Sequence, residues 1–174
     1  MPGPLDRITV QTRSPDGNIR VTMHGRGSIE MWFAPGAYER YGERALAHQL
    51  GVLATSTWVE HRRRYFAALS EEVGDTVRSD DRSDSPKVAG YRRALAELRL
   101  SGGSSAGWVQ ATSISLVRWE FRVREGACRQ LGETEFVGEV HSAIRAVLAD
   151  YDRQVREVQA RLTAVAASPS VGWR

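Results

Sequence analysis

The sequence of 174 residues contains one cysteine, and none of its apolar stretches approaches the roughly 20 residues that a membrane-spanning helix needs. Cys128 has no second cysteine with which to form an intrachain disulfide or a cysteine-rich metal site. We interpret it as a small buried or surface thiol. The first residues also lack the basic-then-apolar order of a signal peptide. We therefore expect a soluble, folded protein in the cytoplasm.

The motifs of enzymes and of metal sites are lacking as well. The histidines are scattered, without ligand spacing to a second histidine, a cysteine or paired carboxylates; they are His24, His48, His61 and His141. A phosphate-binding glycine loop and a nucleophile elbow are absent, and Gly25-Arg26-Gly27 is interpreted as a hairpin turn. The sequence therefore predicts a protein that is not an enzyme and has no cofactor and no metal site.

Charge of either sign is present in nearly equal amounts. Lys and Arg number 24 against 21 Asp and Glu, a net charge of +3, and almost every cation is an arginine. This balance permits a nucleic-acid partner without requiring one. Hydrophobic residues make up 41% and charged residues 26%, which is ordinary for a globular protein, and the length suits one domain or two small related halves.

The first half predicts a three-stranded antiparallel meander. Apolar and polar residues alternate in three short segments, the period-two pattern of half-buried strands. These segments are residues 8–12, 19–23 and 29–33. Pro, Asp, Gly and Asn between the first two supply a tight hairpin turn, and glycines separate the last two. A helix is predicted to follow from about Glu43 to Val73, with Leu46, Leu50 and Leu53 in its apolar stripe.

A polar, aperiodic segment, residues 77–87, predicts a flexible linker between two halves. We expect a first half at residues 1–76 (βββα), a second half at residues 88–168 (αββα) and a tail at residues 169–174. Within the second half the patterns predict a short helix at residues 88–100, a break at 101–105, and strands at 108–114 and 117–123.

The longest segment, residues 133–166, predicts one uninterrupted amphipathic helix, because apolar residues recur at steps of three or four. Such a helix is about 50 Å long, whereas a typical strand covers only about 17–20 Å. Part of its apolar stripe is therefore expected to meet another helix or another subunit.

The two halves align with each other at an offset of 90 positions without a gap. The strand at residues 29–33 then coincides with residues 119–123, Gly36 with Gly126, and Gly42-Glu43 with Gly132-Glu133. This self-similarity predicts an internal duplication that packs as a pseudo-dimer about a pseudo-two-fold axis. Chance similarity is the alternative.

The stretch from Ile8 to Ala54 resembles the YbaB/EbfC family of small bacterial nucleoid-associated proteins. The resemblance rests on the turn Ser14-Pro15-Asp16-Gly17, the strand that ends at Ala34-Pro35, and the helix that opens with Glu43-Arg44-Ala45-Leu46-Ala47. It implies α-β-β-β-α units that dimerise through the sheet region and extend helices as pincers. The helix that precedes the first strand in the family is absent, which implies a tandem or fused member with one arm lost.

The expected fold is therefore α+β, with YbaB-like antiparallel β-meander units, long protruding amphipathic helices and a pseudo-two-fold internal repeat. Several members of the family bind DNA. Actinobacterial proteins associated with type VII secretion also look like this family, and the Arg- and Ala-rich sequence is compatible with such an origin.

Candidate DNA-binding residues lie in the two long predicted helices. Consecutive helical residues cover the circumference, so two or three of Arg62, Arg63 and Arg64 can contact phosphates. A solvated face balanced by nearby glutamates is the alternative. Further candidates in the last helix are Arg145, Arg153 and Arg156, where interspersed acidic residues favour a salt-bridged surface.

Two more sets of residues leave alternatives open. Arg118, Arg122 and Arg124 share a strand face with Glu120, and they form either a binding patch on the sheet or packing stems beneath a helix. Four of the five tryptophans are most simply core or interface anchors, with base stacking as the alternative; they are Trp32, Trp58, Trp108 and Trp119.

The resemblance implies a nucleoid-associated protein that binds double-stranded DNA with low sequence specificity and is located in the cytoplasm at the nucleoid, without membrane contact. The alternative is a protein-interaction scaffold or chaperone-like protein, associated with type VII secretion, whose long helices engage protein partners. Its motivation is the low net charge and the length of the apolar stripes. A fused pseudo-dimer satisfies the family's pairing in one chain, while leftover helix stripe would allow homo-oligomers.

Overall fold

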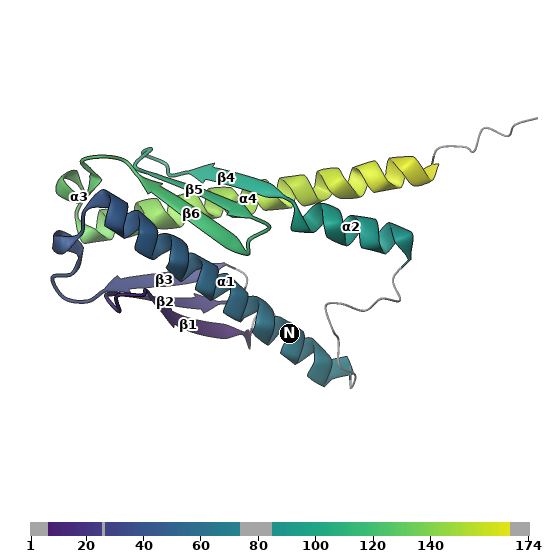
Figure 1. Ribbon diagram of the computed structural model, residues 1–174, viewed down its shortest axis with the longest axis horizontal. Coiled ribbons are helices and arrows are strands. Elements are labelled where there is room, and N and C mark those ends of the chain that lie inside the picture. Colours follow the sequence, from purple (N-terminus) through teal and green to yellow (C-terminus); the bar gives the residue numbers. More distant parts are fainter. Residues whose placement is uncertain (1–6, 26, 74–84, 168–174) are drawn as a thin grey trace, which may run out of the picture.

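The computed structural model describes residues 7–25, 27–73 and 85–167 of the chain. It is an α+β protein with two three-stranded antiparallel sheets and long helices, which confirms the predicted fold class (Figure 1). The first unit contains β1 (Thr9–Arg13), β2 (Ile19–His24), β3 (Ser28–Phe33), the short 3-10 helix η2 (Tyr38–Arg40) and α1 (Glu43–Val73). The second contains α2 (Pro86–Ala96), β4 (Arg99–Gly103), β5 (Val109–Ile114), β6 (Arg118–Val123), α3 (Ala127–Gln130) and α4 (Glu133–Ala167).

The two sheets have the same strand order and the same register at an offset of 90 positions. Thr9 pairs with His24 in the first sheet, and Arg99 pairs with Ile114 in the second. The hairpins agree as well, because the Ser14 hydroxyl accepts the Ile19 amide at 2.9 Å and the Ser104 hydroxyl accepts the Val109 amide at 3.0 Å. Local structure therefore follows the offset found in the sequence, while a common origin of the two units stays a prediction.

The second unit is αβββα, not the expected αββα, because the segment interpreted as a helix end and a break forms strand β4. The predicted linker also ends earlier. Residues 74–84 lie outside the described part of the chain, but the Ser85 hydroxyl accepts the Val88 amide at 3.4 Å and Pro86 begins α2. The predicted tail, residues 169–174, lies outside the described residues too.

Strand β4 contains Gly102, which allows α4 to approach the sheet closely. A Cβ atom at Gly102 would lie 2.6 Å from the Val147 amide nitrogen and 2.7 Å from the Ala146 Cβ atom. At the corresponding place in the first unit, the Thr12 and Thr57 hydroxyls form a hydrogen bond of 2.6 Å. The glycines that suggested a break are thus part of a helix–sheet contact.

The apolar face of each sheet points into the molecule, as the alternation predicts. Val10, Ile19 and Met23 of the first sheet are fully buried, and so is Val109 of the second. Most of the residues between them on the strands are exposed. Each sheet therefore has one face in the core and one face toward solvent.

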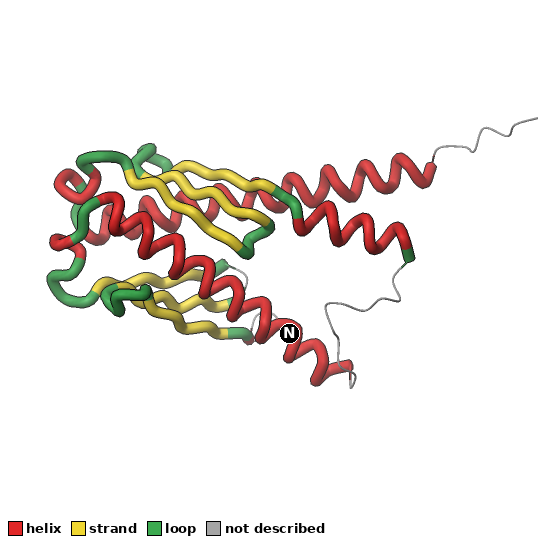
Figure 2. Tube along the Cα trace, in the orientation of Figure 1, coloured by secondary structure: helices red, strands yellow, loops and turns green. Residues whose placement is uncertain are grey.

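Helix α1 packs against β1 of its own sheet and against β6 of the other unit (Figures 1 and 2). The Trp119 amide of β6 donates a hydrogen bond of 3.0 Å to the Thr55 hydroxyl of α1. One turn earlier, a Cβ atom at Gly51 would lie only 3.2 Å from the Trp119 carbonyl oxygen. The Trp58 and Trp119 rings lie 4.6 Å apart. The first long helix thus covers the outer edge of a strand that follows it in the chain by more than forty residues.

Helix α4 packs mainly on β4 and β5, and its C-terminal half lies beside α2 (Figure 1). The Gln159 amide group donates to the Tyr91 hydroxyl at 3.2 Å, and Tyr151, Val155 and Leu162 pack against the core. The expectation that the exposed stripe meets another helix is met by α2. The two long helices do not supply each other's main contacts, because each has a sheet surface nearer to it.

One hydrophobic core joins the two units at the end where both long helices begin. The Tyr38 hydroxyl donates to the Leu131 carbonyl at 3.0 Å, and the rings of Phe33 and Phe136 lie 6.3 Å apart, edge to face. A carboxylate oxygen of Glu43 accepts the Gly126 amide at 3.0 Å. Residues 90 or so positions apart therefore form shared contacts, and the units are packed as one body.

Candidate nucleic-acid interface

Arg62, Arg63 and Arg64 lie exposed in the second half of α1. Arg63 and Arg64 both bind Glu60, with Nε–carboxylate distances of 3.0 Å and 2.8 Å. These hydrogen bonds, first from Arg63 and then from Arg64, lower the pKa of Glu60 to about 2. The carboxylate is therefore charged at neutral pH and holds two guanidiniums in fixed positions on the helix surface.

The other contacts of this arginine cluster, Arg62–Arg64, involve neutral groups. A guanidinium nitrogen of Arg64 donates to the Thr9 carbonyl of β1 at 2.5 Å. The Arg62 guanidinium lies 5.7 Å from the centre of the Phe66 ring, and none of the described carboxylates forms an ion pair with it. Arg63 and Arg64 thus share one carboxylate, Arg62 has no ion-pair partner among the described residues, and the cluster carries a local surplus of positive charge.

The candidate arginines of α4 have a different environment. Arg153 binds Asp150 at 2.5 Å and Glu157 at 2.6 Å, spacings of three and four residues on the helix. Arg145 and Arg156 are exposed. The C-terminal halves of α1 and α4 point apart in Figure 1, so the structure does not bring Arg153 and Arg156 together with the arginine cluster of α1. Arg153 therefore lies in a salt-bridged surface, the alternative to DNA contact that the interspersed acidic residues favoured.

Arg118 and Arg122 of β6, and Arg124 just after it, are exposed on the solvent side of the second sheet and do not lie beneath a helix. Arg118 and Glu120 form an ion pair of 3.8 Å, and the Arg124 guanidinium lies 5.1 Å from the centre of the Trp108 ring. A surface hollow of about 390 Å³ is lined by residues of β4, β5 and β6, among them Arg99, Arg118 and Glu120. Of the two arginines that line this hollow, Arg118 is paired with Glu120.

The outer face of the first sheet carries Trp32 beside two arginines, Arg13 and Arg20, that were not among the candidate residues. Arg13 lies opposite Arg20, and Arg20 lies opposite Trp32. All three side chains are exposed, whereas Trp58 and Trp119 are buried as core anchors, as predicted, and Trp108 is half-buried. Alternation along the strands already placed Trp32 on this face; only the strand register shows which cations lie beside it.

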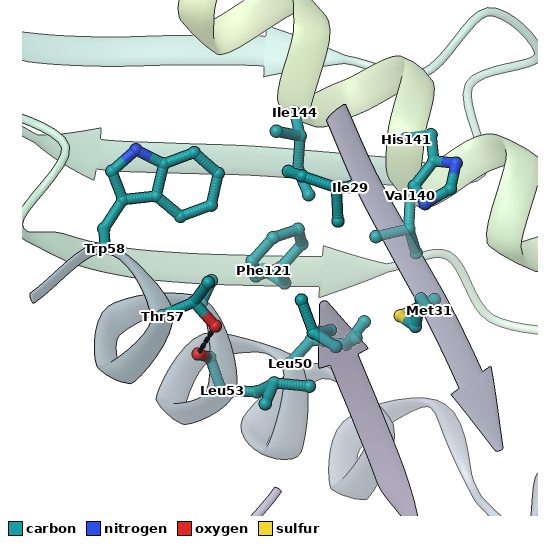
Figure 3. A pocket seen from close by; sticks show the side chains of 12 residues that line it. Ile29, Met31, Leu50, Leu53, Thr57, Trp58, Phe121, Val140, His141 and Ile144 are labelled. Atoms are coloured by element: carbon teal, nitrogen blue, oxygen red, sulfur yellow. Dashed lines mark hydrogen bonds between the residues drawn. The ribbon is translucent and has the colours of Figure 1, made fainter. Parts of the chain in front are cut away.

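A small cavity of about 20 Å³ lies between the two units, lined mainly by apolar residues of α1, β2, β3, β6 and α4 (Figure 3). His141 of α4 borders it, and its Nε2 atom is buried without a hydrogen-bond partner among the described residues. Burial, and to a smaller extent the charge of Arg145, lowers the pKa of His141. Because small-molecule sites have volumes of roughly 300–1,000 Å³, this cavity is a packing gap and not a ligand site.

Helices and side-chain clusters give two further observations. None of the described helices is long and apolar enough to cross a membrane. Within the described ranges, no group of three or more His, Cys, Asp or Glu side chains is placed to hold a metal ion.

The only thiol, that of Cys128, has its pKa raised by burial, and next by the charge of Glu43. Burial thus favours its neutral form.

Comparison with protein-family models, with curated proteins and with solved structures finds no match.

Proposed function

We propose that the protein binds double-stranded DNA with low sequence specificity through the arginine cluster of α1. The observation that carries the proposal is the surplus charge of Arg62, Arg63 and Arg64, which are adjacent and exposed, while Glu60 pairs with Arg63 and Arg64 only. Arginine guanidiniums bind phosphate oxygens in two-point contacts, and such contacts carry no sequence information. The resemblance of residues 8–54 to nucleoid-associated proteins supports the same partner.

The structure weakens the reason for the scaffold alternative. That hypothesis rested on the low net charge and on apolar stripes longer than the sheets could cover, and part of each stripe has a neighbour within the chain, because β6 packs on α1 and α2 packs beside the far half of α4. Val165, near the end of α4, is the large apolar side chain with the greatest exposure among the described residues, at 75%. A protein partner is therefore retained as an outcome of the test and not as a second proposal.

The test is a fluorescence-anisotropy titration of labelled duplex DNA at several salt concentrations. Each phosphate contact contributes a slope of about −0.9 in log K against log [salt] for duplex DNA. The triple variant R62A/R63A/R64A should bind every sequence more weakly, and its salt slope should be shallower by about 0.9 for each contact removed.

The matched control removes three arginines from the opposite end of the same body. Arg40, Arg44 and Arg129 are exposed at the start of α1 and in the short helices beside it. The variant R40A/R44A/R129A has the same net charge as the test variant and should keep the affinity and slope of the parent to a large extent. Equal losses in both variants would show binding by overall charge alone.

Two further results would overturn the proposal. One is the absence of a complex at low salt with protein up to about 100 μM, the weak end of non-specific DNA binding. The other is recovery of a stoichiometric protein partner from a native lysate without nucleic acid, which would favour the scaffold.

A further inference from the structure

A row of three exposed side chains crosses the outer face of the first sheet, one from each strand. Its members, Arg13, Arg20 and Trp32, are directly opposite one another in the antiparallel register. Directly opposite residues have Cβ atoms about 4.5–5.5 Å apart, so the row is continuous and about 10 Å long. This cross-strand row lies on the opposite side of the sheet from the buried Val21 and Met31.

The charges in the cross-strand row lack a counter-charge of their own. Arg13 and Arg20 face each other, and like charges directly opposite in a sheet are unfavourable. Neither forms an ion pair with any described carboxylate. The acidic residue on the same face, Glu30, lies opposite Thr22 and outside the row. An anion bound between the two arginines would supply the missing charge.

The third member of the row is an aromatic ring on an otherwise polar face. Trp32 is 46% exposed, the largest exposed aromatic side chain described. Its neighbours on the face are polar, namely Thr9, Gln11, Thr22, His24, Ser28 and Glu30. The core of a protein–protein interface needs several apolar side chains together, which this face does not offer. A lone accessible ring beside cations is instead the combination that binds single strands, with bases stacking on the ring and cations following the backbone.

We propose that the cross-strand row binds single-stranded nucleic acid, with a base stacked on Trp32 and adjacent phosphates bound by Arg20 and Arg13. Unpaired bases expose the π face that stacking requires, whereas a duplex hides it. The site is on a different surface from the arginine cluster of α1 and does not depend on duplex binding.

The second sheet supplies a matched control, because it has the same register without the same side chains. The positions 90 residues later are Gly103, Gln110 and Arg122, a row with one cation and no ring. Arg122 is exposed and lies opposite Gln110, at the backbone position that Trp32 occupies in the first sheet. R122A therefore removes one exposed arginine from the equivalent row of the second sheet.

The test measures binding of fluorescein-labelled oligo(dT) by anisotropy, alongside duplex DNA. Since stacking on an aromatic side chain is worth roughly 1–3 kcal/mol per base, W32A should weaken oligo(dT) binding by about 5- to 150-fold. W32F should retain most of it. R13A and R20A should each make the salt slope shallower by about 0.7, the value per phosphate for single strands, and R122A should leave affinity and slope unchanged. Circular dichroism checks that each variant is folded.

Three outcomes of the binding assays would overturn the proposal. They are no oligo(dT) binding at low salt with protein up to about 100 μM, equal loss in R122A and R20A, and binding that R62A/R63A/R64A abolishes while W32A does not. A change in the sedimentation of W32A, from dimer to monomer, would also overturn it by showing that a second copy covers the face. If the protein does not bind duplex DNA but binds oligo(dT) in a way that depends on Trp32, the proposed duplex-binding function is refuted and the single-strand site is not.

Discussion

Replacing Gly102 with alanine tests how tightly α4 sits on the second sheet. The added Cβ atom would lie 2.6 Å from the Val147 nitrogen and 2.8 Å from the Ala146 carbonyl carbon, both in the backbone of α4. Backbone atoms cannot rotate away as a side-chain end can, so the helix or β4 must move. Overpacking of this kind costs about 1–3 kcal/mol, against a gain of roughly 0.5–1 kcal/mol from replacing glycine in a strand.

The net expectation for G102A is a loss of about 1–2 kcal/mol in the free energy of unfolding, or a decrease in Tm of roughly 2–8 °C for a chain of this length. Thermal and urea unfolding followed by far-UV circular dichroism would measure both. The control is the next residue, Gly103, where an added Cβ atom meets no heavy atom within 4 Å. G103A should be as stable as the parent or slightly more stable. If G102A is at least as stable as G103A, the close contact is not what the structure indicates.

Two further predictions concern the contacts between the units. T55V removes the acceptor of the Trp119 amide and should destabilise the protein by about 1–3 kcal/mol, while S56A, which removes an exposed hydroxyl bonded to its own helix, should be nearly neutral in urea unfolding. The pKa of His141 is lowered in the folded state. As the pH decreases below about 6.5, the unfolded chain therefore binds more protons than the folded protein, and the free energy of unfolding decreases until the pH reaches the folded-state pKa. Urea midpoints at pH 7.5 and 5.5 should therefore differ less in H141Q than in the parent, and an equal difference would show that His141 does not titrate in this way.

The fold class and most elements could be predicted because alternation and helical periodicity are local properties of the sequence. The meander and the start of α1 at Glu43 follow the prediction closely. Strand β4 was missed because Ser101-Gly102-Gly103 has the composition of a loop, and the reason for its glycine is a contact with α4 that lies over forty residues away. The 90-residue offset contained the missing signal, since it places residues 99–103 on the predicted first strand.

Less of the candidate sites could be predicted. The pairing of Arg63 and Arg64 with Glu60 follows from spacings of three and four on a helix, which is visible in the sequence. The position of Arg13 beside Arg20 and Trp32 depends on strand register, and neither hydrophobic periodicity nor composition decides which residues face each other across a sheet. The cover of α1 by β6 depends on the packing of two units and has no local signal.

The packing of α1 against β6 has a consequence for synthesis of the protein on the ribosome. The partner of the Trp58 face of α1 is the edge of β6, and about 50 residues separate the end of α1 from the end of β6. At roughly 5–20 residues per second, translation of this interval takes about 3–10 s, far longer than a helix needs to form. During these seconds the nascent first unit has an apolar helix face without its native neighbour. The growing chain therefore exposes an apolar helix face that the finished molecule buries against β6.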